Sequence, residues 1–198
     1  MKILLIGSTG TLGARLHDVL ASRGHEVLGV SRNSGDLRYD IGDPNQLRAM
    51  YEDVGCLDAV VSAAGDVVYK PFADLSNEDY TTSFTGKVLT QINLVRAGSP
   101  YVRTPGSFTL ITGILAHEPT LTGAAAAMAN GALESFVRSA AIEISPQRVN
   151  AVSPSVFTES LEQFGSRFPG MVAVDLATVA QAYVRSIEGA QTGEIYAP

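Results

Sequence analysis

The stretch KILLIGSTGTLG, residues 2–13, decides the fold. Lys2–Ile6 is an almost continuous apolar run, which is typical of a strand buried on both faces of a sheet. Gly7, Gly10 and Gly13 follow with the spacing G-x-x-G-x-x-G, and the next apolar residues repeat at helical spacing. Glycines at such a junction allow a tight turn and let backbone N–H groups approach a pyrophosphate. The stretch therefore predicts a dinucleotide-binding loop, with an ordinary strand-to-helix turn as the alternative.

The rest of the chain alternates short apolar runs with longer stretches of helical period. This alternation predicts a parallel sheet that right-handed crossovers cover on both faces. We therefore expect an α/β, doubly wound Rossmann fold with a seven-stranded, mainly parallel sheet, and a single domain over residues 1–198. The strands are expected at residues 2–6, 26–30, 37–41, 57–62, 107–112, 148–152 and 193–196.

Two helix starts carry recognisable caps. Asp43 is expected to cap a helix with Pro44 at its first position, and Gln46 is expected to close a capping box. Ser76 is expected to cap a longer helix that runs to Val95 or Arg96. Apolar stripes predict two further helices, Thr122–Ile144 and the stretch around 176–187.

Composition narrows the class of protein. The chain has 198 residues, of which 45% are apolar, so a disordered chain is excluded. Twenty acidic and fourteen basic residues give a net charge of −6, which argues against a nucleic-acid partner. The lone Cys56 cannot form an internal disulfide, so we expect the cytoplasm as the location. No apolar run approaches the ~18 residues of a membrane span, and scattered His17, His25 and His117 predict no metal site.

The end of the second strand selects between the two nicotinamide dinucleotides. NAD sites usually place an acid there, whereas a basic residue accommodates the 2′-phosphate of NADP. Here Ser31 and Arg32 follow the strand, and no acid occurs before Asp36. We therefore predict NADP as the cofactor, with NAD less favoured; the alternative for Arg32 is a solvated surface arginine.

In these features the chain resembles the short-chain dehydrogenase/reductase family along nearly its whole length. Besides the glycine loop, Ser62–Gly65 is similar to the family's Asn-Asn-Ala-Gly turn. Glu134–Glu143 with Arg148–Pro154 resembles its long helix, sixth strand and Pro-Gly turn, with Ser155 in place of the glycine. The resemblance implies that the cofactor contacts Gly7, Ser8, Thr9, Gly10, Thr11, Leu12, Gly13, Ser31, Arg32, Asp40, Ile41, Ala63, Ala64, Gly65, Pro154, Ser155, Val156 and Thr158.

The family's catalytic residues are missing. They are a serine, a Tyr-x-x-x-Lys pair on the long helix and an asparagine on the preceding helix. By register, Gly113 stands at the serine position, Ala126 at the tyrosine position and Asn130 at the lysine position. No other register helps, because no tyrosine lies between Tyr101 and Tyr183 and no lysine follows residue 87. The usual mechanism is therefore not expected.

Other residues are candidates for the missing chemistry. Lys87 falls at or next to the position of the family's asparagine, and Asn130 stands at the position of its lysine. The two residue types would thus be exchanged between the two helices, and we expect Lys87 to point to the nicotinamide ribose. The alternative is a solvated lysine on an exposed helix face. His117 and the Thr112 hydroxyl are candidate proton donors, and Tyr69 with the lysine after it is less favoured.

Two functions remain open. One is an NADP-dependent oxidoreductase that acts on a small carbonyl or alcohol substrate by a non-standard active site. The other is a catalytically inactive NADP(H)-binding sensor or regulatory protein. A short lid, Phe157–Val174, predicts a small, partly apolar ligand. The alanine-rich Gly123–Ala132 region with Phe136 predicts a homodimer or tetramer through the long central helices, unless that face is buried within one chain.

Overall fold

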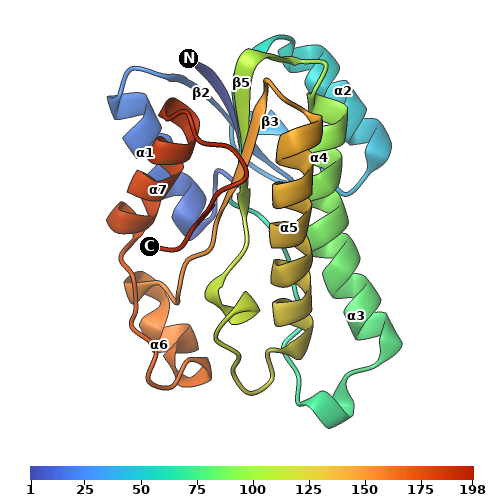
Figure 1. Cartoon of the computed structure of the whole chain (residues 1–198), viewed down its shortest axis with the longest axis vertical. Coiled ribbons are helices and arrows are strands. Elements are labelled where there is room, and N and C mark those ends of the chain that lie inside the picture. The colour runs from blue at the N-terminus through green and yellow to red at the C-terminus, as the bar shows by residue number, and fades with distance from the viewer.

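The computed structural model describes residues 1–198 and contains one seven-stranded parallel sheet, in the order β3-β2-β1-β4-β5-β6-β7 (Figure 1). This confirms the predicted doubly wound Rossmann fold. The central strands are buried on both faces; Ile3, Leu4 and Leu5 of β1 are fully inaccessible. The strands are β1 Lys2–Ile6, β2 Glu26–Ser31, β3 Leu37–Arg38, β4 Leu57–Ser62, β5 Val102–Ile111, β6 Arg148–Val152 and β7 Ile195–Tyr196.

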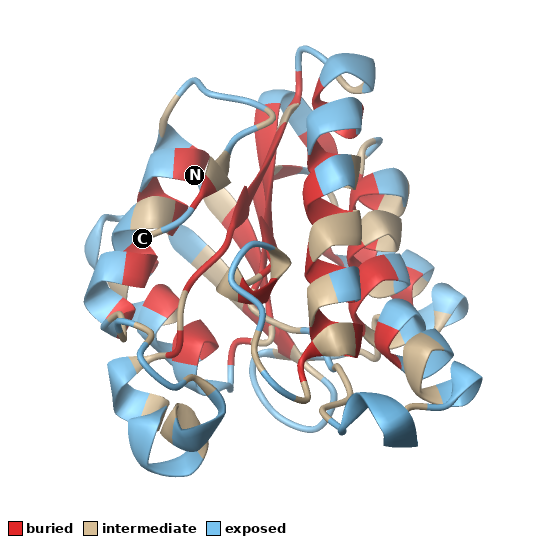
Figure 2. Ribbon diagram, turned by 60° about the horizontal axis from the view of Figure 1, so that its bottom comes forward, coloured by how far each residue is buried: buried red, intermediate tan, exposed pale blue.

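Helices cover both faces of the sheet, so that two apolar cores form. Helices α1 (Thr11–Ser22) and α7 (Leu176–Glu188) pack together on one face. Helices α2 (Pro44–Val54), α4 (Thr90–Gly98) and α5 (Ala124–Glu143) cover the other face. Figure 2 shows buried strands between helices that are buried along one side and exposed along the other. None of these helices is long and apolar enough to span a membrane.

The helix that Ser76 caps differs from its predicted form. Ser76 and Asp79 form a reciprocal capping box at its start, and α3 covers Asn77–Ser83. A π-helical turn, Phe84–Leu89, then separates α3 from α4, so the segment is not one regular helix. A π-turn accommodates one extra residue, which shifts every side chain around it, and such turns are frequent at functional sites.

Several predicted boundaries are also corrected. Strand β5 begins at Val102, five residues before the predicted start, and β3 and β7 have only two residues each. Asp43 does cap α2, because its Oδ1 accepts the Asn45 N–H at 2.8 Å. The predicted capping box with Gln46 is wrong: Gln46 Oε1 accepts from the Asp40 N–H at 3.0 Å, while the Asp43 N–H is donated to the Asp40 carbonyl.

Short elements gather at the carboxyl ends of the strands, at the lower edge in Figure 1. They are the 3-10 turns η1 Phe72–Asp74, η3 Ile114–Ala116, η4 Thr158–Ser160 and η5 Gly165–Arg167, and the short helix α6 Leu161–Phe164. Ligands of open α/β sheets bind at this edge. The functional site is therefore expected there.

Candidate active site

The glycine loop connects β1 to α1 in a conformation that only glycine fits. Gly7 has a φ of +80°, and a Cβ at Gly13 would lie 1.9 Å from the Gly7 carbonyl oxygen. Gly10 stands at the N-cap of α1, where no side chain caps the helix. Gly10 lines two adjoining cavities, and a Cβ there would have only the Gly7 carbonyl oxygen within 4 Å, at 3.5 Å. The bare helix end, with its open side, therefore fits a pyrophosphate group.

One cavity extends from the glycine loop over β2 and has a volume of about 570 Å³. Asp36 is turned away from it, because its Oδ2 accepts the Gly29 N–H at 2.9 Å. Arg32 is exposed, and its only ionic partner is the still more exposed Asp66 at 3.8 Å, a weak and screened pair. The guanidinium is thus available to a phosphate. The predicted cofactor contacts that line this cavity are Gly7, Thr9, Gly10, Ser31, Arg32, Asp40, Ile41, Ala63, Ala64 and Gly65.

A second cavity of about 520 Å³ shares Gly10, Ala63 and Gly65 with the first, so the two adjoin. Of the other predicted cofactor residues, it is lined by Thr11, Leu12, Pro154, Ser155 and Val156. Ser8 and Gly13 are buried and line neither cavity, and Thr158 is exposed outside both. Ser160, two residues further on, lines the second cavity instead.

Lys87 lines the second cavity and is buried, with only 8% of its surface exposed. The alternative of a solvated lysine is therefore wrong. Its Nζ donates to the Thr112 carbonyl oxygen at 3.0 Å, and burial lowers the pKa of Lys87 to about 8. The lysine stem packs on Gly65, where a Cβ would lie 2.9 Å from Lys87 Cγ. The π-turn and a glycine thus bring the ammonium into the cavity.

Asn130 lines the same cavity from α5. Its Nδ2 donates to the Gly113 carbonyl at 3.1 Å, while its buried Oδ1 has no hydrogen-bond partner. A Cβ at Gly113 would lie 3.0 Å from Asn130 Nδ2, so the amide occupies space that a serine side chain there would need. The structure thus brings Lys87 and Asn130 to one cavity, without a hydrogen bond between them. Ala126 is buried in α5 and does not line the cavity.

The two candidate proton donors His117 and Thr112 contact the buried carboxylate of Glu134. Glu134 is only 2% exposed, and its Oε2 lies 2.7 Å from His117 Nε2. Its Oε1 accepts from Ser153 Oγ at 3.2 Å and from Thr112 Oγ1 at 3.5 Å. The Thr112 hydroxyl also donates to the Val152 carbonyl at 3.3 Å. Thr112 lines the second cavity, whereas His117 does not, and both side chains connect the loop after β5 to Glu134.

The lid closes the outer side of the second cavity. Phe157 and Val174 form a parallel bridge at the ends of the lid, and between them Phe164 of α6 and Phe168, which follows η5, line the cavity. Arg167 lines the cavity too, with its Cζ 5.0 Å from the Tyr69 ring centroid and 5.3 Å from that of Phe164. Sequence reasoning missed Arg167, since nothing local pairs the lid with the loop after β4.

Comparisons with known proteins show which proteins this chain is similar to. A family model described as enoyl-(acyl carrier protein) reductase matches residues 14–189. The crystal structure of the protein lin1944 from Listeria innocua is 44% identical, with a TM-score of 0.96, over 100% of this chain and 98% of that one. Carbonyl reductase [NADPH] 2 from Sus scrofa is 27% identical over 79% of this chain and 71% of its own length. Epimerase family protein SDR39U1 from Bos taurus is 29% identical over 62% of this chain, and the match spans only 40% of that relative.

Proposed function

Because this chain belongs to the short-chain dehydrogenase/reductase family, we propose that it is an NADP-dependent oxidoreductase of a small carbonyl or alcohol substrate with a non-standard active site. The observation that carries the proposal is the buried Lys87 in the second cavity, beside the unpartnered Asn130 Oδ1. Burying an ammonium costs free energy. A buried lysine at the cofactor-binding edge of the sheet therefore indicates that Lys87 has a chemical role.

The cofactor would lie across the two adjoining cavities. The glycine loop and the N-terminus of α1 would hold its pyrophosphate, and Arg32 with Ser31 would hold a 2′-phosphate. The nicotinamide end would enter the second cavity between the glycine loop and Pro154–Val156. Bound NADPH supplies the hydride for the carbonyl carbon. That a relative is named as an NADPH-dependent carbonyl reductase supports this choice of cofactor.

The proton for the substrate oxygen would come from Lys87. One Nζ proton is used in the bond to the Thr112 carbonyl, which leaves two for the cavity. A pKa of about 8 keeps the group mostly protonated at neutral pH, yet able to release a proton. Asn130 Oδ1 is an acceptor that would orient the ammonium or a substrate hydroxyl. Tyr69, whose pKa burial raises, would remain a neutral phenol on the cavity wall.

The test is oxidation of NADPH with a panel of small aldehydes and ketones, for the wild type, Lys87→Met and Lys70→Met. Lys70 is a matched control, because its ammonium pairs with Asp79 at 2.7 Å and lines neither cavity. We expect turnover by the wild type and the control, and a loss of about 100-fold for Lys87→Met, as for removal of a general acid. Full activity of Lys87→Met would contradict the role of this lysine.

A cofactor-binding sensor without turnover is the second candidate. It is favoured by the hydrogen bonds of the Thr112 hydroxyl and the His117 imidazole to Glu134, which engage both groups within the chain. Under this alternative the protein binds NADPH tightly but oxidises it with no member of the panel. A cytoplasmic location remains a prediction for either function.

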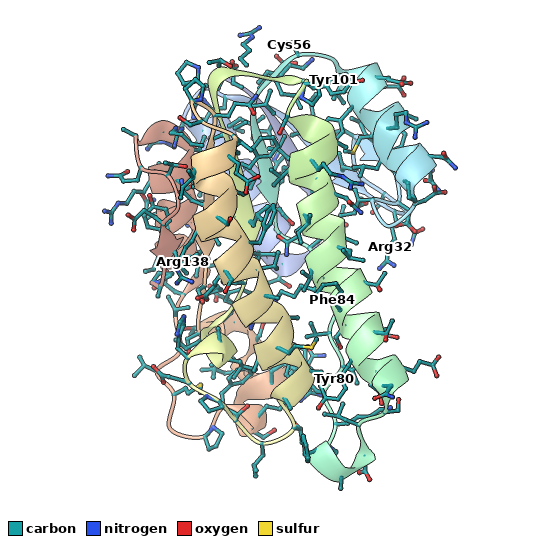
Figure 3. The ribbon with its side chains drawn as sticks, turned by 45° about the vertical axis from the view of Figure 1, so that its right-hand side comes forward. Arg32, Cys56, Tyr80, Phe84, Tyr101 and Arg138 are labelled. Carbon is teal, nitrogen blue, oxygen red and sulfur yellow. The ribbon has the colours of Figure 1, made fainter.

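A homodimer or tetramer through the long central helices is also proposed. Ala125, Ala126 and Ala129 of the predicted region are buried within the chain and serve the monomer core, whereas Ala124, Ala127 and Ala132 are half-buried. The outer side of the π-turn Phe84–Leu89 and of α5, which lie side by side in Figure 3, exposes apolar side chains and a glycine. Phe84, Leu89 and Met128 are 38%, 38% and 36% exposed, and nothing lies within 4 Å of a Cβ at Gly131. This surface would meet its copy across a two-fold axis.

A further inference from the structure

Arg167 has an unusual place among the basic residues of the chain. It lies in the lid, its guanidinium faces the rings of Tyr69 and Phe164, and it lines the second cavity. It forms neither a hydrogen bond nor an ion pair with any protein group, although the chain carries a net charge of −6. An arginine without an acidic partner keeps its planar donors available for a ligand.

Two aromatic rings contact the guanidinium of Arg167, which is an exposed residue of the lid. Tyr69 comes from the loop after β4 and Phe164 from α6, so Arg167 joins the lid to the opposite wall of the cavity. Cation–π contacts hold an arginine by the face of its guanidinium and leave the N–H edge free. A side chain held in this way loses less entropy when its edge binds an anion.

The cavity has a strongly one-sided charge. Lys87 and Arg167 line it, and no aspartate or glutamate does. Glu159, an acid of the lid, is turned away, because its Oε1 accepts the Leu176 N–H at 3.1 Å. Between the two cations the walls are apolar and include Leu115, Val156 and Phe168. Such a cavity attracts an anionic group on an apolar body.

We propose that Arg167 binds a carboxylate of the substrate, so that the substrate class is a small carbonyl compound with an apolar or aromatic body and a carboxylate remote from the carbonyl. This inference rests on the proposed function, because it concerns the substrate of the same site. Lys87 would face the carbonyl oxygen, and Arg167 at the lid would select the acid and orient it.

The test measures binding separately from turnover. Calorimetry would compare terephthalaldehydic acid with its methyl ester on the chain saturated with NADP⁺. The variants are Arg167→Met, Arg167→Lys and the control Arg185→Met. Arg185 is a matched control, because its Cζ also lies 5.0 Å from a tyrosine ring, that of Tyr196, but it does not line the cavity.

For the wild type and the control, we expect the acid to bind about tenfold more tightly than the ester, as one exposed charge-assisted hydrogen bond allows. Arg167→Met should remove this preference and leave ester binding unchanged, and Arg167→Lys should restore part of it. Equal binding of acid and ester by the wild type would overturn the inference. So would an unchanged preference in Arg167→Met, or a weaker affinity of that variant for NADP⁺ itself.

NADPH oxidation with the same two compounds separates this inference from the proposed function. Turnover without a preference for the acid overturns only the role of Arg167. Selective binding of the acid without turnover overturns the oxidoreductase and leaves the anion site standing.

Discussion

Lys87 Nζ donates a hydrogen bond of 3.0 Å to the carbonyl oxygen of Thr112, the residue that directly follows β5. The bond connects the π-turn before α4 to the carboxyl edge of the sheet, and it holds an ammonium at the cavity that adjoins the glycine loop. In the family that the sequence resembles, the lysine belongs to the long central helix. Here that helix supplies Asn130, and the charge comes from its neighbour.

The buried ammonium predicts a specific dependence of stability on pH. Its pKa is about 8 in the folded chain, against 10.5 for an ordinary lysine. Between these values the unfolded chain binds the proton and the folded chain does not, so this lysine makes stability rise with pH. Below pH 8 the lysine is charged in both states, so the full free-energy cost of burying the ammonium lowers the stability of the folded chain. Lys87→Met removes the cost, which the pKa shift puts at about 3 kcal/mol, and also loses one hydrogen bond of about 1 kcal/mol.

Urea unfolding at several pH values checks this prediction. At pH 7 we expect Lys87→Met to be more stable than the wild type by about 2 kcal/mol; the difference should fall through zero between pH 8 and 10.5 and reverse above that range, where only the lost hydrogen bond remains. The buried Tyr51 and Tyr183, whose pKa values burial raises, affect both proteins equally. A difference that does not vary with pH would show that the lysine is not buried in its charged form.

The same group sets the pH profile of the reaction. If Lys87 donates the proton, carbonyl reduction needs its ammonium form, so the rate should fall by about tenfold per pH unit above about pH 8. Lys87→Met should show a low rate with no such decline. A wild-type rate that stays constant up to pH 10 would assign proton donation to another group, such as the Tyr69 phenol.

Arg32 should determine the choice of dinucleotide. Arg32→Ala is expected to raise the Kd of NADPH by about tenfold, since a charge-assisted contact to an exposed phosphate is lost, and to leave NADH unchanged. Arg38→Ala is the control, because Arg38 is also exposed but lies in β3 and does not line the cavity. Equal weakening of NADPH and NADH would mean that Arg32 supports the fold of the loop and not the 2′-phosphate.

The sequence predicts those parts of the site that depend on local order along the chain. The glycine loop lies between a strand and a helix that are contiguous with it, so Gly7, Gly10 and Gly13 identify it directly. The burial of Lys87 depends on a π-turn and on its contact with Gly65, which lies 22 residues away in the chain. Neither has a local signal. Arg167 likewise depends on contact between the lid and the loop after β4.

His117 is a residue for which the sequence predicts a functional role that the contacts in the fold do not support. Its position after β5 suggests a proton donor, but the fold directs it to Glu134, which also accepts from Ser153. Glu134→Ala should therefore cost about 2–3 kcal/mol of stability, because buried hydroxyls lose their acceptor. Urea unfolding of Glu134→Ala and of Glu143→Ala, an exposed glutamate of the same helix, measures this.

His117→Ala should keep turnover within about twofold of the wild type, whereas removal of a general acid would lower turnover by about 100-fold or more.

The outer side of α5 makes the oligomer testable without damage to the monomer. Gly131 is half-buried, and a Cβ there would have no neighbour within 4 Å, so the chain itself tolerates a larger residue. Gly131→Arg should therefore fold with normal or slightly greater stability, since glycine in a helix is unfavourable by about 1 kcal/mol. At an interface, however, an arginine would separate the two copies.

Sedimentation should then show a dimer or tetramer for the wild type and for Gly131→Ala, and a 20.8 kDa species for Gly131→Arg. A wild type that already sediments at 20.8 kDa would contradict the proposed assembly, and an intact oligomer of Gly131→Arg would place its interface elsewhere.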